Sequence, residues 1–141
     1  MEKSKINLKY YTVSELIRSS AAQRHSISNV PESDDVWRNL QRLGERVLDP
    51  ARERLGMPIV VNSGYRSERV NRLVGGARHS QHTKGQAADI TCKDNDALLL
   101  VLQQMEYDQL IKYLDRYGRI RWIHVSYRES GNRRQQLTKP V

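Results

Sequence analysis

The chain has 141 residues, and its 24 lysines and arginines against 16 aspartates and glutamates give a formal net charge of +8 at pH 7. The single cysteine excludes an internal disulfide, and the absence of phenylalanine leaves leucine, isoleucine, valine and tyrosine to form the core. This length fits one domain, residues 1–141. The charge predicts attraction to polyanions, among them nucleic acids, anionic cell-wall polymers and lipid surfaces.

The sequence contains no segment that we expect to enter or cross a membrane. The first residues, MEKSKINLKYYTVSEL, lack the apolar stretch of a secretory signal. The apolar run ALLLVL at 97–102 is far too short for a transmembrane helix. We therefore expect a protein made soluble in the cytoplasm without a signal peptide, which would need another route to act outside the cell.

The N-terminal half is predicted to be mainly helical. Thr12 and Glu15 have the spacing of a capping box, which predicts a helix over 13–24. Apolar residues then recur at helical spacing over 35–55. Within this second helix Pro50 should bend or restart the chain, and the glycine that follows residue 55 should end it.

The C-terminal half is predicted to alternate short strands and helices. We expect a strand over 59–62, a helix over 67–74, a strand over 86–92, a helix over 95–105, and a hairpin of strands 107–113 and 120–127 around RYGR. The polar, basic tail 128–141 should fray. Helices followed by antiparallel strands favour an α+β fold, a small antiparallel sheet with helices packed around it.

Two histidines and an aspartate have the composition of a metal site. His82 and Asp89 are seven residues apart, and Asp89 lies in the apolar segment AADIT, where an ionised carboxylate is costly unless it is paired or bound to a metal. His124 lies in an alternating strand, on the same face as Trp122 and Ser126, with Ile123 and Val125 on the other face. Two imidazoles and one carboxylate from separate segments match a catalytic zinc shell with one open position.

These residues also have a more ordinary interpretation. A histidine in a strand is most often a hydrogen-bonded core residue, and many loops contain a histidine and an aspartate seven apart. Spacing alone leaves both interpretations open.

The segments around the triad are more specific. SGYRSERVNRLVGGARHSQHTKGQAADI, followed by DQLI and WIHVSY, resembles the zinc D-alanyl-D-alanine carboxypeptidase family of peptidoglycan metallopeptidases, which shares the hedgehog-like zinc fold. The family signature is Ser-x-His-x-x-Gly-x-Ala-x-Asp, joined later by a histidine in an HV-type strand. The positions that meet it are Ser80, His82, Gly85, Ala87, Asp89 and His124. The resemblance extends over about 11–127.

The resemblance implies that His82, Asp89 and His124 bind Zn²⁺. It further implies that Arg66 lies beside the substrate and stabilises the charge that develops on the scissile carbonyl oxygen. Ser80 matches a serine that lines the substrate site. A surface arginine and a local turn serine are the ordinary alternatives for these two residues.

The general base is where the chain departs from the family. Many members carry an aspartate or glutamate three residues before the last zinc histidine, and this chain has Arg121 there. If 107–113 pairs with 120–127, Asp108 lies near Ser126 and can share the face of His124, but a one-residue change of register turns it away. Its alternative role is to pair with an arginine. Asp115 is the second candidate, closer to the turn.

We therefore predict a zinc peptidase that hydrolyses peptide bonds in bacterial peptidoglycan, as a carboxypeptidase or an endopeptidase. Its expected partners are peptidoglycan stem peptides, with no specific nucleic acid and no membrane span, and we expect a monomer that acts on the cell wall. A non-catalytic zinc-containing module that binds cell wall is the alternative. Nucleic-acid binding is a third hypothesis that only the charge supports, since no stacking motif or recognition helix is present.

Overall fold

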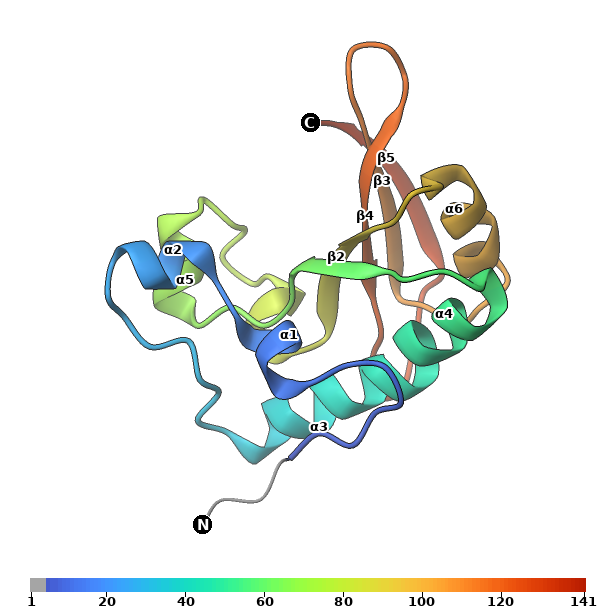
Figure 1. Cartoon of the computed structure of the whole chain (residues 1–141). Coiled ribbons are helices and arrows are strands. Elements are labelled where there is room, and N and C mark those ends of the chain that lie inside the picture. Colours follow the sequence, from blue (N-terminus) through green and yellow to red (C-terminus); the bar gives the residue numbers. More distant parts are fainter. Residues whose placement is uncertain (1–4) are drawn as a thin grey trace.

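The computed structural model describes residues 5–141 and has the predicted α+β architecture, a five-stranded sheet with helices against it (Figure 1). The helices are α1 (Val13–Ile17), α2 (Ser20–Arg24), α3 (Asp34–Leu43), the π-helical η1 (Gly44–Leu48), α4 (Asp49–Leu55), α5 (Glu68–Leu73), the 3₁₀-helical η2 (Gln81–Lys84) and α6 (Asn95–Gln103). The strands are β1 (Val60–Ser63), β2 (Ala87–Thr91), β3 (Gln109–Leu114), β4 (Ile120–Ser126) and β5 (Gln135–Pro140).

The prediction of a single helix over 13–24 is wrong, because the segment forms two helices, α1 and α2. The capping box at Thr12 is present, but the backbone turns extended at Arg18 and Ser19, and Ser19 caps α2. The side chain of Asn29 donates a hydrogen bond to the Ile17 carbonyl oxygen at 2.6 Å. Because side chains satisfy the backbone groups at the break, the chain does not need a continuous helix there.

The helix predicted over 35–55 runs from α3 through η1 to α4. Pro50 lies in the first turn of α4, directly after η1, so the helix restarts at the proline as predicted. A proline ring clashes with the carbonyl of a regular turn and offers no N–H, and the wider π turn accommodates it. Gly56 ends the helix in the left-handed conformation with φ of 75°.

The tail was predicted to fray, and this prediction is wrong, because 135–140 forms β5. The sheet has the order β1-β2-β4-β3-β5, and β5 pairs in parallel with β3, whereas the other neighbours are antiparallel. Arg134 donates side-chain hydrogen bonds to the carbonyl oxygens of Met105 and Gln103, at 2.9 Å for Gln103. Hydrogen bonds to a free sheet edge, rather than burial of apolar side chains, order this polar segment.

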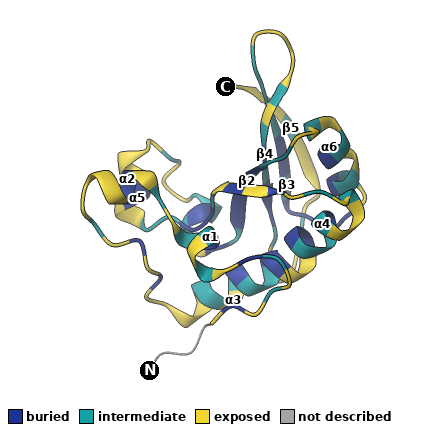
Figure 2. Cartoon of the chain, viewed as in Figure 1, coloured by how far each residue is buried: buried dark blue, intermediate teal, exposed yellow. Residues whose placement is uncertain are grey.

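The two faces of the sheet differ in character. Figure 2 shows the buried residues gathered where the strands meet the helices. Ile123 and Val125 of β4 are fully buried in a core cluster, as their alternation predicted, and His124 lies on the opposite face. The core helices thus cover the face of Ile123 and Val125, and the opposite face carries His124 together with Ile111 and Trp122. Among residues 5–141, no helix is long and apolar enough to cross a membrane.

Candidate metal centre

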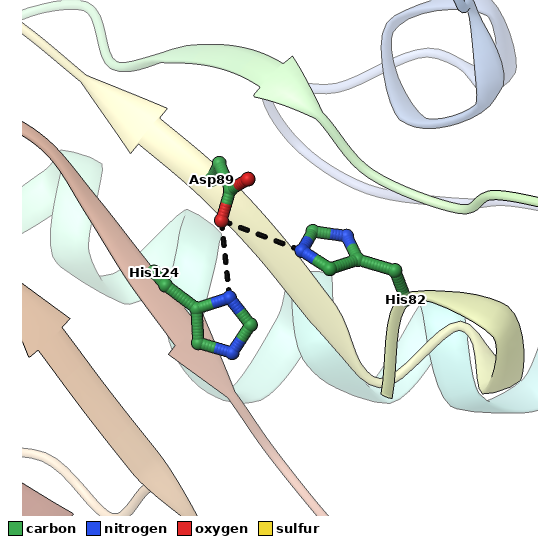
Figure 3. Close-up of side chains that lie close together, drawn as sticks. All are labelled: His82, Asp89 and His124. Carbon is green, nitrogen blue, oxygen red and sulfur yellow. Dashed lines mark hydrogen bonds and ion pairs between the residues drawn. The ribbon is translucent and has the colours of Figure 1, made fainter. Parts of the chain in front are cut away.

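The three predicted ligands lie together. Asp89 of β2 and His124 of β4 are directly paired across the antiparallel ladder, and His82 comes from η2 (Figure 3). Asp89 Oδ1 lies 3.0 Å from His124 Nδ1 and 3.4 Å from His82 Nε2. Each residue offers one ligand atom, and these three atoms all lie within 4.8 Å of one another. This spacing suits three ligands around one ion.

The hydrogen bonding of His82 turns one ring nitrogen toward Asp89. His82 Nδ1 lies 2.7 Å from the carbonyl oxygen of Gly64, an acceptor, so Nδ1 carries the proton. Its Nε2, the ring nitrogen left for a metal, faces the Asp89 oxygen at 3.4 Å. A metal ion between them satisfies both, and the Gly64 carbonyl oxygen fixes the ring orientation.

Asp89 is ionised in this setting. Burial opposes its ionisation, but the hydrogen bonds and charges of His124 and His82 outweigh it and hold the pKa of Asp89 well below its usual range. Its side chain is only 16% exposed. A largely buried carboxylate with this preference for its charged form is well suited to a cation.

Local sequence explains how η2 presents His82. The Ser80 hydroxyl caps η2 and accepts a hydrogen bond from the His82 backbone N–H at 3.1 Å. Gly85 ends η2 with φ of 74°, and a Cβ there would lie 2.7 Å from the carbonyl oxygen of Val36 in α3. The left-handed turn and this close approach both require glycine. Ser80 also lines the cavity beside the metal centre, so the turn role and the predicted substrate role are compatible.

Arg66 is held beside the centre. Its Nη2 donates to Asp89 Oδ2 at 3.4 Å, its Nε to Ser63 Oγ at 3.0 Å, and its Nη1 to Asn71 Oδ1 at 3.1 Å. At Gly76 a Cβ would lie 2.0 Å from the same Asn71 oxygen, so glycine leaves room for this pair. The guanidinium is therefore fixed next to the carboxylate oxygen that does not face the histidines.

A cavity of about 510 Å³ opens beside these residues. Its walls include the apolar side chains of Val74, Ala77, Ile111 and Trp122. Tyr113 also lines it and stacks on Trp122, with ring centroids 4.8 Å apart. Burial raises the pKa of Tyr113, and the charge of Asp89 adds to this rise, so the phenol keeps its proton and can donate a hydrogen bond.

Asp108 is not part of this cluster. Its backbone N–H donates to the Ser126 carbonyl oxygen at 2.8 Å, as the predicted proximity required, but its carboxylate is fully buried and bonded to Arg133. Arg133 Nε and Nη2 bind its two oxygens at 3.0 and 2.7 Å, and Gln81 donates a further bond at 3.1 Å. Asp108 lies just before β3, and its partners Gln81 and Arg133 both line the cavity, so the carboxylate is bound beneath the cavity wall. The arrangement is the arginine pair that the sequence left as the alternative.

This arrangement makes a prediction for Asp108→Asn. We expect a loss of about 2 kcal/mol in the free energy of unfolding, because one charge-assisted acceptor is replaced by an amide N–H₂ that faces the Arg133 donors. Thermal unfolding should shift down by roughly 4–8 °C for a chain of this size. The kcat, measured well below the transition, should stay within a few-fold. A kcat lower by a hundredfold at normal stability would instead make Asp108 the base.

The pH dependence of this effect has a defined sign. The hydrogen bonds from Arg133 lower the pKa of Asp108 in the folded state. Its stabilisation is therefore present above the unfolded pKa of about 4 and is lost as the pH falls through the lower folded value. The difference in stability between the wild type and Asp108→Asn should shrink in that acidic range. The exposed Glu106→Gln serves as the control for the loss of one carboxylate, and its stability should stay close to that of the wild type.

The other candidate positions for a base also lie away from the centre. Asp115 accepts hydrogen bonds from the backbone N–H groups of Tyr117 and Arg119 in the hairpin turn. Arg121 is exposed, and its nearest carboxylate is Asp115 at 3.8 Å. Of the residues that line the cavity, Asp89 alone carries a carboxylate.

Tyr113 and Lys139 are among the cavity residues that the sequence did not single out. The alternation of β3 could have found Tyr113, because 109, 111 and 113 share a face with His124 once the hairpin register is known. No local signal marks Lys139, which lies in the tail that was expected to fray.

Comparison with known proteins agrees with the site. The profile of Peptidase M15, a family of metal-dependent peptidases, matches residues 9–126. No curated protein matches the chain significantly. The match spans most of the chain and includes all three residues of the metal centre. The chain therefore belongs to the Peptidase M15 family.

Proposed function

We propose that the protein is a zinc peptidase that hydrolyses peptide bonds in bacterial peptidoglycan. The observation that carries the proposal is the convergence of His82, Asp89 and His124 in an open cavity, with Arg66 fixed beside them. Membership of a peptidase family supplies the reaction class.

The donor set supports zinc. Two imidazole nitrogens and one carboxylate oxygen are ligands that zinc commonly takes in hydrolases, and three protein ligands leave a position for water or substrate. When bound there, zinc would lower the pKa of its water toward ~7 and polarise the peptide carbonyl. A structural zinc would more often be closed by four ligands, several of them cysteines, and the chain has one cysteine.

The side chains around the centre have separate roles in the proposal. The Arg66 guanidinium stabilises the negative charge that develops on the scissile carbonyl oxygen, because its contacts hold it in place before the reaction. The protonated Tyr113 phenol offers a further hydrogen-bond donor to the substrate. The Ser80 hydroxyl accepts a hydrogen bond from the backbone N–H of His82 and so positions it, and Ser80 also lines the substrate cavity.

The proposed substrate is a peptidoglycan stem peptide. The net charge of +8 favours adsorption to an anionic cell wall. The apolar wall of the cavity, with Val74, Ala77 and Ile111, suits the methyl groups of alanine residues. We propose that the chain acts on the wall as a monomer.

Purified peptidoglycan tests this function directly. It should be incubated with the zinc-loaded protein, with the chelated protein, and with the chelated protein after zinc is restored, and the products identified by mass spectrometry. We expect new peptide fragments only when zinc is present, and their masses identify the bond. Fragments that persist after complete chelation would rule out a metallopeptidase.

A non-catalytic zinc module that binds cell wall is the second candidate. The observation in its favour is that the cavity lining offers no carboxylate besides Asp89 to take a proton from water. This candidate would be correct if the protein holds one zinc per chain and binds peptidoglycan but leaves the peptidoglycan intact.

A further inference from the structure

We infer that Lys139 of β5 forms an anion subsite in the same cavity, which binds a carboxylate of the substrate peptide two to three residues from the scissile bond. The inference rests on the proposed function, and it names the chemical character of the substrate that the metal centre itself leaves open. Lys139 lies outside the segment 9–126 that the family profile matches.

The register of the sheet places Lys139 on the face of the metal centre. In the parallel pair of β3 and β5, Lys139 is opposite Tyr113, and Tyr113 is opposite Trp122 of β4. Paired residues in a sheet share a face, and the stacked rings of Tyr113 and Trp122 agree with this. The next row is Leu137, Ile111 and His124. Strand β5 therefore extends the floor of the cavity away from the metal centre.

The cavity has an excess of positive charge. Basic side chains that line it are Arg66, His79, Arg133 and Lys139, and Asp89 is the one carboxylate among the lining residues. Asp89 is committed to the metal, Arg66 contacts Asp89, and Arg133 is paired with Asp108. Within residues 5–141, Lys139 has no carboxylate within ion-pair distance. His79 and Lys139 are the two that have no carboxylate partner among these residues, and Lys139 lies on the strand that extends the floor of the cavity, so its ammonium is placed to receive a negative group of the substrate.

Strand spacing gives the distance at which this group would lie. Strand β5 is two strands from β4, which is roughly 10 Å, and Lys139 is one row beyond His124, which is about 7 Å along the strand. The two Cα atoms are therefore roughly 12 Å apart, and the lysine side chain spans part of that distance. An extended peptide advances about 3.3 Å per residue, so the carboxylate is two to three residues from the bond at the metal.

The chemistry at that distance identifies one group of a stem peptide. The γ-linked D-glutamyl residue carries a free α-carboxylate two residues before the penultimate D-alanine. A terminal D-alanine carboxylate would be only one residue from the scissile bond, too close for Lys139. The subsite thus favours stems with a free D-glutamyl carboxylate over stems in which this group is an amide.

Two synthetic pentapeptide stems test the subsite, one with D-glutamate and one with D-isoglutamine, which removes the charge. The KM of the wild type should be about fivefold lower for the acid than for the amide, as for an exposed ion pair. Lys139→Gln should lose this preference with kcat within about twofold, and Lys139→Arg should restore it. Lys112→Gln is the matched control, since Lys112 pairs with Thr138 and Ile123 and faces away from the metal centre.

The result separates the subsite from the reaction. An equal preference in the wild type and Lys139→Gln, or none in the wild type, overturns the subsite even when both peptides are cleaved. If the zinc-loaded wild type cleaves neither peptide, calorimetry with the same peptides decides the subsite, and the digestion of purified peptidoglycan decides the peptidase proposal separately. If the wild type binds the D-glutamate peptide more tightly than the D-isoglutamine peptide, and Lys139→Gln does not, the subsite is supported. Equal binding of the two peptides by the wild type, or no binding, overturns it.

Discussion

Replacing His124 by alanine is expected to remove zinc binding and hydrolysis together. The remaining ligands, His82 and Asp89, offer one nitrogen and one oxygen, too few for a tight catalytic zinc site. A catalytic metal supplies several kcal/mol of transition-state stabilisation, and about 4 kcal/mol corresponds to about a thousandfold in rate. We therefore expect kcat/KM to fall at least about a thousandfold, with the zinc content near zero.

The measurements are the zinc content of the dialysed protein and the release of peptide fragments. His25→Ala is the matched control, because His25 is exposed at the end of α2, away from the triad. It should keep one zinc and full activity. A His124→Ala protein that retains one tightly bound zinc would show that the metal lies elsewhere. The thermal transition should be recorded for both variants, so that a misfolded protein is not taken for a ligand mutant.

Arg66→Lys should lower kcat about a hundredfold at saturating zinc and leave KM within a few-fold. The lysine keeps the charge but cannot make the three contacts through Nε, Nη1 and Nη2 that hold the guanidinium beside Asp89. Loss of one fixed donor to a developing oxyanion costs about 10²–10³ in rate. The steady-state kcat and KM on a defined stem peptide measure the effect.

The zinc dependence separates two roles of Arg66. Its contact with Asp89 also orients a metal ligand, and loss of such a contact weakens metal affinity by about 10–100-fold. If high zinc restores full kcat to Arg66→Lys, the arginine only positions Asp89 and does not stabilise the transition state. The exposed Arg69→Lys in α5 is the control for a general effect of the substitution, and it should behave as the wild type.

Local patterns were sufficient for several parts of this protein. The capping box at Thr12, the helical spacing over 35–55 and the apolar alternation of Ile123 and Val125 each depend on a few neighbouring residues. After 56, the predicted helices and strands up to β4 all lie within two residues of their observed ends. The spacing of His82 and Asp89 matches a known signature, and the structure brings both together with His124 as that signature implies.

The general base shows where local patterns stop. Whether Asp108 faces His124 depends on how the two strands are aligned, because a shift of the pairing by one residue moves every side chain to the other face. Asp108 lies just before β3, and Arg133 from the tail and Gln81 from η2 bind its carboxylate. Neither the register nor these partners are encoded within a few residues of Asp108.

Residue types and short-range periodicity thus defined the ligands, most elements and the buried face of β4, because these follow from the geometry of one strand or helix. The polar tail carries no such signal. It becomes β5 because β3 offers a free edge, and the pairing brings Lys139 into the cavity beside Tyr113. The floor of the cavity is thus formed by contacts between segments that are far apart in the chain. Backbone hydrogen bonds across a sheet depend on which edge is free, and the composition of the added strand does not reveal that edge.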